Sequence, residues 1–148
     1  MSSKSPRQRW MAILARASTP ELTALLAHCP DLPAFTVLRA PQSGLVMLRG
    51  RAGREGGPFN LGEMTVTRCT VRVPGGEVGH AYVAGRDQAQ AELAARLDAA
   101  LQDPASHDAI EAELVAPLER AQAARRVADA ERAAATRVQF FTMATMRS

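Results

Sequence analysis

Residues 64–97 read MTVTRCTVRVPGGEVGHAYVAGRDQAQAELAARL and carry the strongest secondary-structure signals in the chain. The first ten residues are rich in valine and threonine, which favour strands, and Pro74-Gly75-Gly76 ends them. A second strand follows over EVGHAYVAG, and an amphipathic helix begins after Gly85-Arg86-Asp87. The segment therefore predicts an antiparallel hairpin followed by a helix.

The turn of this hairpin sets which side chains share a face. If Gly75-Gly76 is a two-residue turn, Val71 lies opposite His80, and a four-residue loop gives the same pairing. We therefore expect His80 on the apolar face, as a core or half-buried imidazole rather than a general base. The other face would carry Arg68 and Arg72 beside small residues, which indicate that something packs closely there: Gly79, Ala81, Val83 and Gly85.

The Gly85-Arg86-Asp87 turn has a structural interpretation for two of its three residues. Gly85 frees the backbone to leave the strand, and Asp87 is placed to cap the following helix, with Gln90 three residues later. Nothing local requires Arg86. A functional role for this arginine therefore stays open.

The remaining segments predict a single α+β domain over residues 1–148. We expect an antiparallel sheet of about four strands packed with helices, because residues 35–40 and 44–51 read as a further hairpin around Pro41. Pro117 should bend or interrupt the long helical segment near the C-terminus. The expected parts are N-terminal helices over 7–28, a sheet over 35–85, a helix over 87–102, a C-terminal helical segment over 106–138, and an apolar tail over 138–146.

Composition and charge exclude several classes of protein. The net charge is +3, but 17 of the 18 cations are arginine in an alanine-rich chain, and no basic run or aromatic-interleaved patch appears, so we expect no nucleic-acid partner. No apolar run is long enough to cross a membrane, and the N-terminus lacks a signal-peptide pattern, so a cytoplasmic location is expected. Cys29 and Cys69 have no metal or redox spacing and should be reduced thiols.

The sequence contains no self-contained active site. His28 and His107 lie near predicted helix boundaries without companion ligands, so surface or capping roles are expected and no metal site is predicted. The glycine-rich segment AGREGG lacks the pattern of a phosphate-binding loop. No catalytic residue and no cofactor of its own are therefore assigned to the chain.

The C-terminal tail predicts a contact surface. The segment VQFFTM places four apolar side chains near a terminus that would otherwise fray: Val138, Phe140, Phe141 and Met143. Docking against the chain's own core or into another subunit explains them better than exposure does. We also expect the isolated chain to self-associate through its alanine-rich helical stripe.

Four segments together resemble the PhnG family, the G subunit of the bacterial carbon-phosphorus lyase core complex. They are RQRWMAILA, then SGLVMLRGRAGREGGPFNLGEMTVTRCTVRV, then GHAYVAGRDQAQAELAARLDAAL, and finally RVQFFTM. They follow the family's order and cover most of the chain.

The resemblance implies a role in phosphonate catabolism. Proteins similar to this one act with subunits H, I and L when a phosphonate displaces adenine from ATP, giving α-D-ribose 1-methylphosphonate 5-triphosphate. In that family the nucleosidase chemistry belongs to subunit I, and subunit J later uses S-adenosylmethionine and an iron-sulfur cluster. The resemblance therefore implies an obligate, non-catalytic subunit of a multi-subunit transferase, with subunits I, H and J as partners.

The resemblance also changes the interpretation of three arginines. Arg68, Arg72 and Arg86 become candidates for contacting subunit I or an anionic ligand, because a guanidinium can grip a carboxylate or phosphate through two parallel hydrogen bonds. The alternative is a free-standing small enzyme or phosphate-ligand-binding domain that uses these arginines together with His80.

Overall fold

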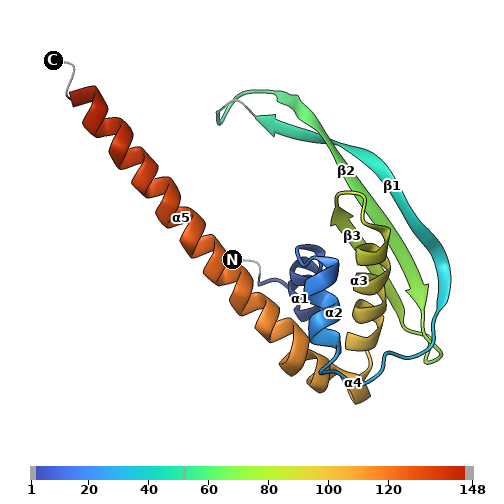
Figure 1. The fold of residues 1–148 in the computed structure, drawn as a ribbon. Helices are drawn as coiled ribbons and strands as arrows, with labels where there is room; N and C mark the ends of the chain where they lie inside the picture. The colour runs from blue at the N-terminus through green and yellow to red at the C-terminus, as the bar shows by residue number, and fades with distance from the viewer. Residues whose placement is uncertain (1–2, 52, 146–148) are drawn as a thin grey trace.

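The computed structural model describes residues 3–51 and 53–145, and only the backbone of residues 138–145. Within them the chain forms an antiparallel three-stranded sheet in the order β1-β2-β3, with helices on one of its faces (Figure 1). The predicted α+β class is confirmed. The strands are β1 (Thr36–Arg51), β2 (Pro58–Arg72) and β3 (Val78–Ala84). The helices are α1 (Pro6–Ala15), α2 (Thr19–Leu26), α3 (Gln88–Leu101), α4 (Pro104–Ile110), the π-helical turn η1 (Glu111–Val115) and α5 (Ala116–Thr145).

The first two helices begin at capping boxes. The Ser5 hydroxyl accepts the Gln8 amide, and the Gln8 side chain accepts the Ser5 amide. Ser18 and Glu21 make the same reciprocal pair at the start of α2, which has a proline in its first turn. Each box satisfies amide groups that the helix itself leaves free.

The prediction of a separate hairpin over residues 35–51 is wrong. These residues form one continuous strand, β1, and the described sheet therefore has three strands rather than about four. Pro41 remains inside β1 because this strand lies at the edge of the sheet, and the pairing with β2 shifts register on the N-terminal side of Gln42. The turn comes later, near Gly53, whose φ of 76° suits a glycine.

The predicted register of the β2–β3 hairpin is wrong by one residue. The Val73 amide donates to the Glu77 carbonyl at 3.1 Å, so the loop has three residues, Pro74 to Gly76. Gly76 has a φ of 95°, as the last position of such a loop requires. Thr70 therefore lies opposite His80. Because the loop has an odd number of residues, His80 lies on the same face as Arg68 and Arg72 and not on the predicted apolar face.

Helix α3 packs on the face of the sheet that contains the small residues of β3. Gly79 is buried, and a Cβ atom there would lie 2.8 Å from the Ala99 amide nitrogen and closer still to the Ala95 carbonyl oxygen. This confirms the prediction of a close approach at the small residues. The core lies between α1, α3, η1 and this face, and its largest fully buried side chains include Leu14, Leu97, Leu101, Leu114 and Val71.

The C-terminal helical segment is interrupted just before Pro117. The Ala116 amide bonds to the Glu111 carbonyl, five residues back, in the π-helical turn η1. Pro117 has no amide hydrogen, which favours an irregular turn at this point. Ile110, Leu114 and Leu118, which recur every four residues along this segment, are buried.

Beyond Ala123, the described side chains of α5 are exposed, and the helix extends well past the rest of the molecule (Figure 1). Its backbone remains helical through Thr145, so the predicted tail continues the helix. The side chains of Val138, Phe140, Phe141 and Met143 lie outside the described residues. None of the described helices is long and apolar enough for a membrane span.

Candidate functional site

The turn between β3 and α3 ends in the N-cap residue of α3, Asp87. Gly85 has a φ of 97°, and the Asp87 carboxylate accepts the Gln90 amide at 3.0 Å and the Thr19 hydroxyl at 2.7 Å. These bonds, the Gln90 amide first, lower the pKa of Asp87 because they stabilise its charged form. Arg86 is exposed and makes no hydrogen bond or ion pair with any described residue.

A buried carboxylate in α3 joins three parts of the chain. Asp98 is 0% exposed and accepts the Trp10 indole N–H at 2.8 Å, the His80 amide at 2.9 Å, and two bonds from the Arg7 guanidinium at 2.8 and 3.2 Å. We call Arg7, Trp10, His80 and Asp98 the Asp98 cluster. The hydrogen bond to Asp98 raises the pKa of the Arg7 guanidinium, which therefore stays charged.

The Asp98 cluster fastens α1 to one edge of the sheet. Arg7 and Gln102 both donate to the Val78 carbonyl, at 3.1 and 2.8 Å, so side chains occupy the outward backbone groups at the start of β3. This cluster was not predicted from the sequence. Asp98 stands within the apolar run of α3 between Leu97 and Ala99, and a lone carboxylate in such a run could have indicated a buried, satisfied acid.

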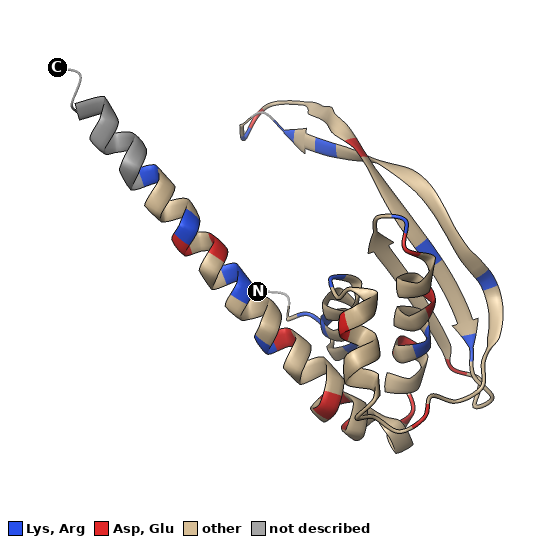
Figure 2. Ribbon diagram, in the orientation of Figure 1, with Lys and Arg blue, Asp and Glu red and all other residues tan. Residues whose placement is uncertain are grey.

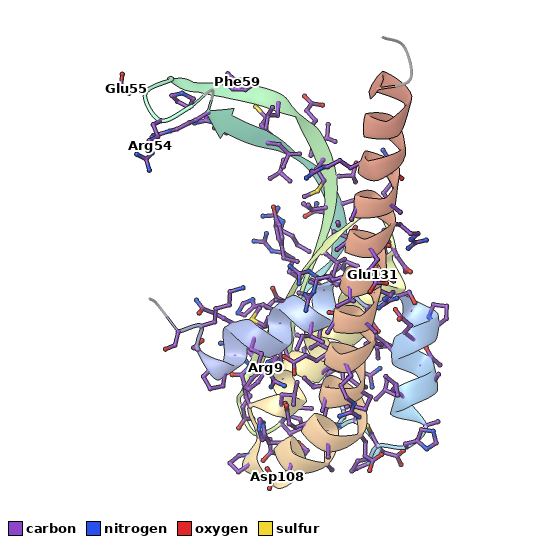
Figure 3. The ribbon with its side chains drawn as sticks, turned by 90° about the vertical axis from the view of Figure 1, so that its left-hand side faces the viewer. Arg9, Arg54, Glu55, Phe59, Asp108 and Glu131 are labelled. Atoms are coloured by element: carbon purple, nitrogen blue, oxygen red, sulfur yellow. The ribbon has the colours of Figure 1, made fainter. Side chains whose placement is uncertain are left out.

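A second ionic contact joins α1 to the C-terminal helices. Arg9 donates to Glu111 at 2.7 Å and to both carboxylate oxygens of Glu119, and Figure 3 shows it between α1 and α5. The hydrogen bond from Arg9 lowers the pKa of Glu119. These bonds fix the start of α5 relative to α1.

The face of the sheet opposite α3 carries the predicted arginines. Arg68 lies opposite Tyr82 and Arg72 opposite Val78, while Arg39 of β1 lies opposite Thr70. The described residues provide no ion pair for Arg39, Arg68 or Arg72. Arg86 lies in the turn after β3 rather than on the strand positions of this face, so the structure unites two of the three candidates and adds Arg39.

His80 shares this exposed face with the arginines. Its ring lies 3.3 Å from the Thr70 hydroxyl, and the side chain is exposed instead of half-buried among valines. A shallow hollow of about 520 Å³ opens here. It is lined by Met11, Leu38, Arg39, Arg68, Thr70, His80, Ala81 and Tyr82. Two of these side chains are arginines, so the hollow suits an anionic partner.

Large apolar side chains are exposed on the distal parts of β1 and β2, which together with the turn between them (residues 44–51 and 53–62) we call the arm. Leu45 is 66% exposed, Leu61 64% and Phe59 45%. The arm extends beyond the helices and bends towards the side of the sheet on which they lie (Figure 1), and Phe59 lies near its tip with Arg54 and Glu55 (Figure 3). Charged residues recur along the outer part of α5 (Figure 2), where the Val127 side chain is 58% exposed. Such apolar exposure is typical of surfaces that bind other proteins.

The described residues contain no group of three or more histidine, cysteine, aspartate or glutamate side chains placed to hold a metal ion. Cys69 is buried and Cys29 half-buried, and both are free thiols, as predicted. Burial raises the pKa of each thiol, which disfavours the thiolate. The Nδ1–H of His107 donates to the Leu101 carbonyl at 2.8 Å, at the end of α3, which matches its expected capping role.

Comparison with known proteins finds similarity over nearly the whole chain. A sequence model of the family described as "Phosphonate metabolism protein PhnG" matches residues 5–146. A protein of Rhizobium meliloti (strain 1021), named alpha-D-ribose 1-methylphosphonate 5-triphosphate synthase subunit PhnG, is 48% identical over 139 residues. The aligned region covers 93% of this chain and 87% of that relative.

Proposed function

We propose that this chain, which belongs to the family of phosphonate metabolism protein PhnG, is an obligate, non-catalytic subunit of an alpha-D-ribose 1-methylphosphonate 5-triphosphate synthase. In this proposal it acts with subunits H, I and L while a phosphonate displaces adenine from ATP. The 48% identity to a synthase subunit over 93% of the chain is the observation that carries the proposal.

The distribution of apolar surface supports a role in assembly. The arm and the outer part of α5 expose leucine, phenylalanine and valine side chains, and an unsupported two-stranded ribbon is only marginally stable in water. Contact with other subunits would cover these side chains and hold the arm. The Asp98 cluster and the Arg9 contacts, by contrast, have partners within the chain and serve the fold.

Reconstitution tests the proposal directly. The purified chain alone, subunits H, I and L without it, and the complete mixture are each incubated with ATP and methylphosphonate, and released adenine is measured by chromatography. We expect adenine only from the complete mixture. Turnover by the chain alone would overturn the non-catalytic role, and full activity without the chain would overturn the obligate one.

We propose separately, from the sequence pattern of the tail, that its two phenylalanines contact subunit I. We expect Phe140→Ala combined with Phe141→Ala to weaken co-purification with subunit I, because aromatic side chains dominate many protein interfaces. Thr142→Ala serves as the control from the same tail. A melting curve of each variant accompanies the pull-down, and an unaffected complex would remove the two phenylalanines from the interface.

A further inference from the structure

Strand β3 lies at one edge of the sheet, and half of that edge is closed by side chains. Neighbouring residues of an edge strand point their backbone groups alternately towards the sheet and outward. The Gly85 amide bonds to Thr65 of β2, whereas the His80 amide bonds to Asp98 and the Val78 carbonyl to Arg7 and Gln102. The backbone N–H and C=O groups of the even-numbered residues of β3 therefore point away from β2, out of the edge of the sheet.

The same alternation leaves the second half of β3 open. The next outward groups are the N–H and C=O of Tyr82, followed by those of Ala84. Among the residues that the structure describes, no side chain or loop forms a hydrogen bond with either group of Tyr82. The opposite edge, β1, is instead interrupted by Pro41 and by three shifts of register, features that discourage strand pairing.

An apolar groove borders this open edge. Helix α1 packs against α3 and lies beside β3, and a groove of about 220 Å³ runs between them. The groove is lined by Met11, Ala12, Leu14 and Ala15 of α1, by residues 80–83 of β3, and by Ala94 of α3. Its lining is mostly apolar and small. A strand added to β3 would lie above α1 and cover this groove.

The hollow on the other face of the sheet continues from this groove. Both are lined by Met11, His80, Ala81 and Tyr82, so they meet at the open edge. Arg39 and Arg68 line the hollow and have no ion-pair partner among the described residues. Because successive side chains of a strand point to opposite faces, one added strand would reach the groove and the arginines with alternate residues.

We propose that the open edge at Tyr82 binds an extended segment of another synthase subunit, which adds a short fourth strand to the sheet. The segment places small apolar side chains in the groove beside α1 and a carboxylate against Arg39 and Arg68. Backbone hydrogen bonds to Tyr82 supply affinity, and the alternating side chains supply specificity. The closed half of the edge, at Val78 and His80, limits the pairing to a few residues. The inference rests on the proposed function because the partner belongs to the same assembly.

A pair of variants at Tyr82 isolates the backbone contribution. Tyr82→Pro removes the outward N–H without breaking a bond between β2 and β3, whereas Tyr82→Thr removes the ring and keeps the N–H. Each tagged variant is co-expressed with the other synthase subunits, and the affinity of the purified chain for them is measured. We expect Tyr82→Pro to bind about tenfold more weakly than Tyr82→Thr, because a backbone acceptor loses its donor.

Arg68→Glu tests the acidic part of the proposal in the same assay. We expect a loss of binding at least as large as that of Tyr82→Pro, since a carboxylate would then face a carboxylate. Unchanged binding of this variant would overturn the assignment of an acidic segment.

Hydrogen exchange provides a measurement that needs no substitution. In the isolated chain the Tyr82 amide should exchange rapidly. The His80 amide, which bonds to Asp98, and the Val83 amide, which is directed towards β2, should both be protected. In the complex the Tyr82 amide should become protected as well. This readout also decides the case in which Tyr82→Pro does not fold.

The outcomes separate the two proposals. If the unmodified chain forms no complex, the proposed function fails and the docking site fails with it. If the complex forms but Tyr82 stays unprotected and Tyr82→Pro matches Tyr82→Thr, only the docking site is overturned. If the Tyr82 amide is protected in the isolated chain and sedimentation shows a dimer, the β3 edge binds a second copy of this chain. That result would also overturn the proposed docking site.

Discussion

Replacing Asp98 with alanine should destabilise the fold more than any single exposed substitution. The change leaves three donors without their acceptor: the Arg7 guanidinium, the Trp10 indole N–H and the His80 amide. It also weakens the attachment of α1 to β3, because Asp98 bonds to both elements, while the bond from Arg7 to the Val78 carbonyl remains.

The magnitude follows from the burial of these groups. Removing one partner of a buried ion pair costs about 3–5 kcal/mol. The Arg7 side chain is 39% exposed, so water replaces part of its lost interaction, but the indole of Trp10 is almost fully buried. We therefore expect a loss of about 3–5 kcal/mol from Asp98→Ala, and about 1–3 kcal/mol from Asp98→Asn, which keeps one acceptor oxygen.

Urea unfolding followed by circular dichroism and by fluorescence gives the measurement. Trp10 is the single tryptophan of the chain and belongs to the Asp98 cluster, so its fluorescence reports on this contact. Asp108→Ala is the matched control, since Asp108 is an exposed aspartate on α4 (Figure 3) and should change the free energy of unfolding by at most about 0.5 kcal/mol. A loss below about 1 kcal/mol for Asp98→Ala would refute the assignment of Asp98 as the group that holds α1 on the sheet.

Two further predictions concern packing and acid. Gly79→Ala should lower the free energy of unfolding by about 1–3 kcal/mol, because its methyl group would collide with α3. Gly44→Ala is the control, since no atom lies within 4 Å of the added carbon, and it should lower the free energy of unfolding far less. Equal melting temperatures of the two variants would contradict this prediction. Arg9 lowers the pKa of Glu119 below its ordinary 4.5, so their contact stabilises the fold fully above about pH 4.5 and the stabilisation is lost as the pH falls through the lowered pKa. The difference in unfolding free energy between the unmodified chain and Glu119→Gln should therefore be largest near about pH 7 and shrink progressively as the pH falls below 4.5; a constant difference would exclude the charge as its cause.

Local signals in the sequence predicted the parts of the fold that depend on neighbours along the chain. The capping role of Asp87, the left-handed backbone of Gly85 and the interruption before Pro117 each follow from one or two adjacent residues. The close approach at Gly79 was also predicted, because a glycine inside a strand often marks a place where another backbone lies very near.

The errors arose where one residue more or less changes the result. Pro41 was interpreted as part of a turn, but an edge strand tolerates a proline, and only pairing with β2 keeps β1 continuous. The three-residue loop before Glu77 shifted His80 from the predicted core face to the exposed face. No alternation pattern distinguishes the two registers when valines occupy both faces of the hairpin.

The sequence by itself determined the α+β class, the positions of the caps and the membership suggested by four matching segments, because these depend on residue types and spacings along the chain. The tertiary structure alone decided that Arg68, Arg39 and His80 share one face and that Asp98 holds residues about 90 positions away. It also decided that the β3 edge is closed at Val78 and open at Tyr82. These features depend on strand register and on how α1 docks, which are set by contacts between segments distant in the chain and leave no periodic signal within either segment.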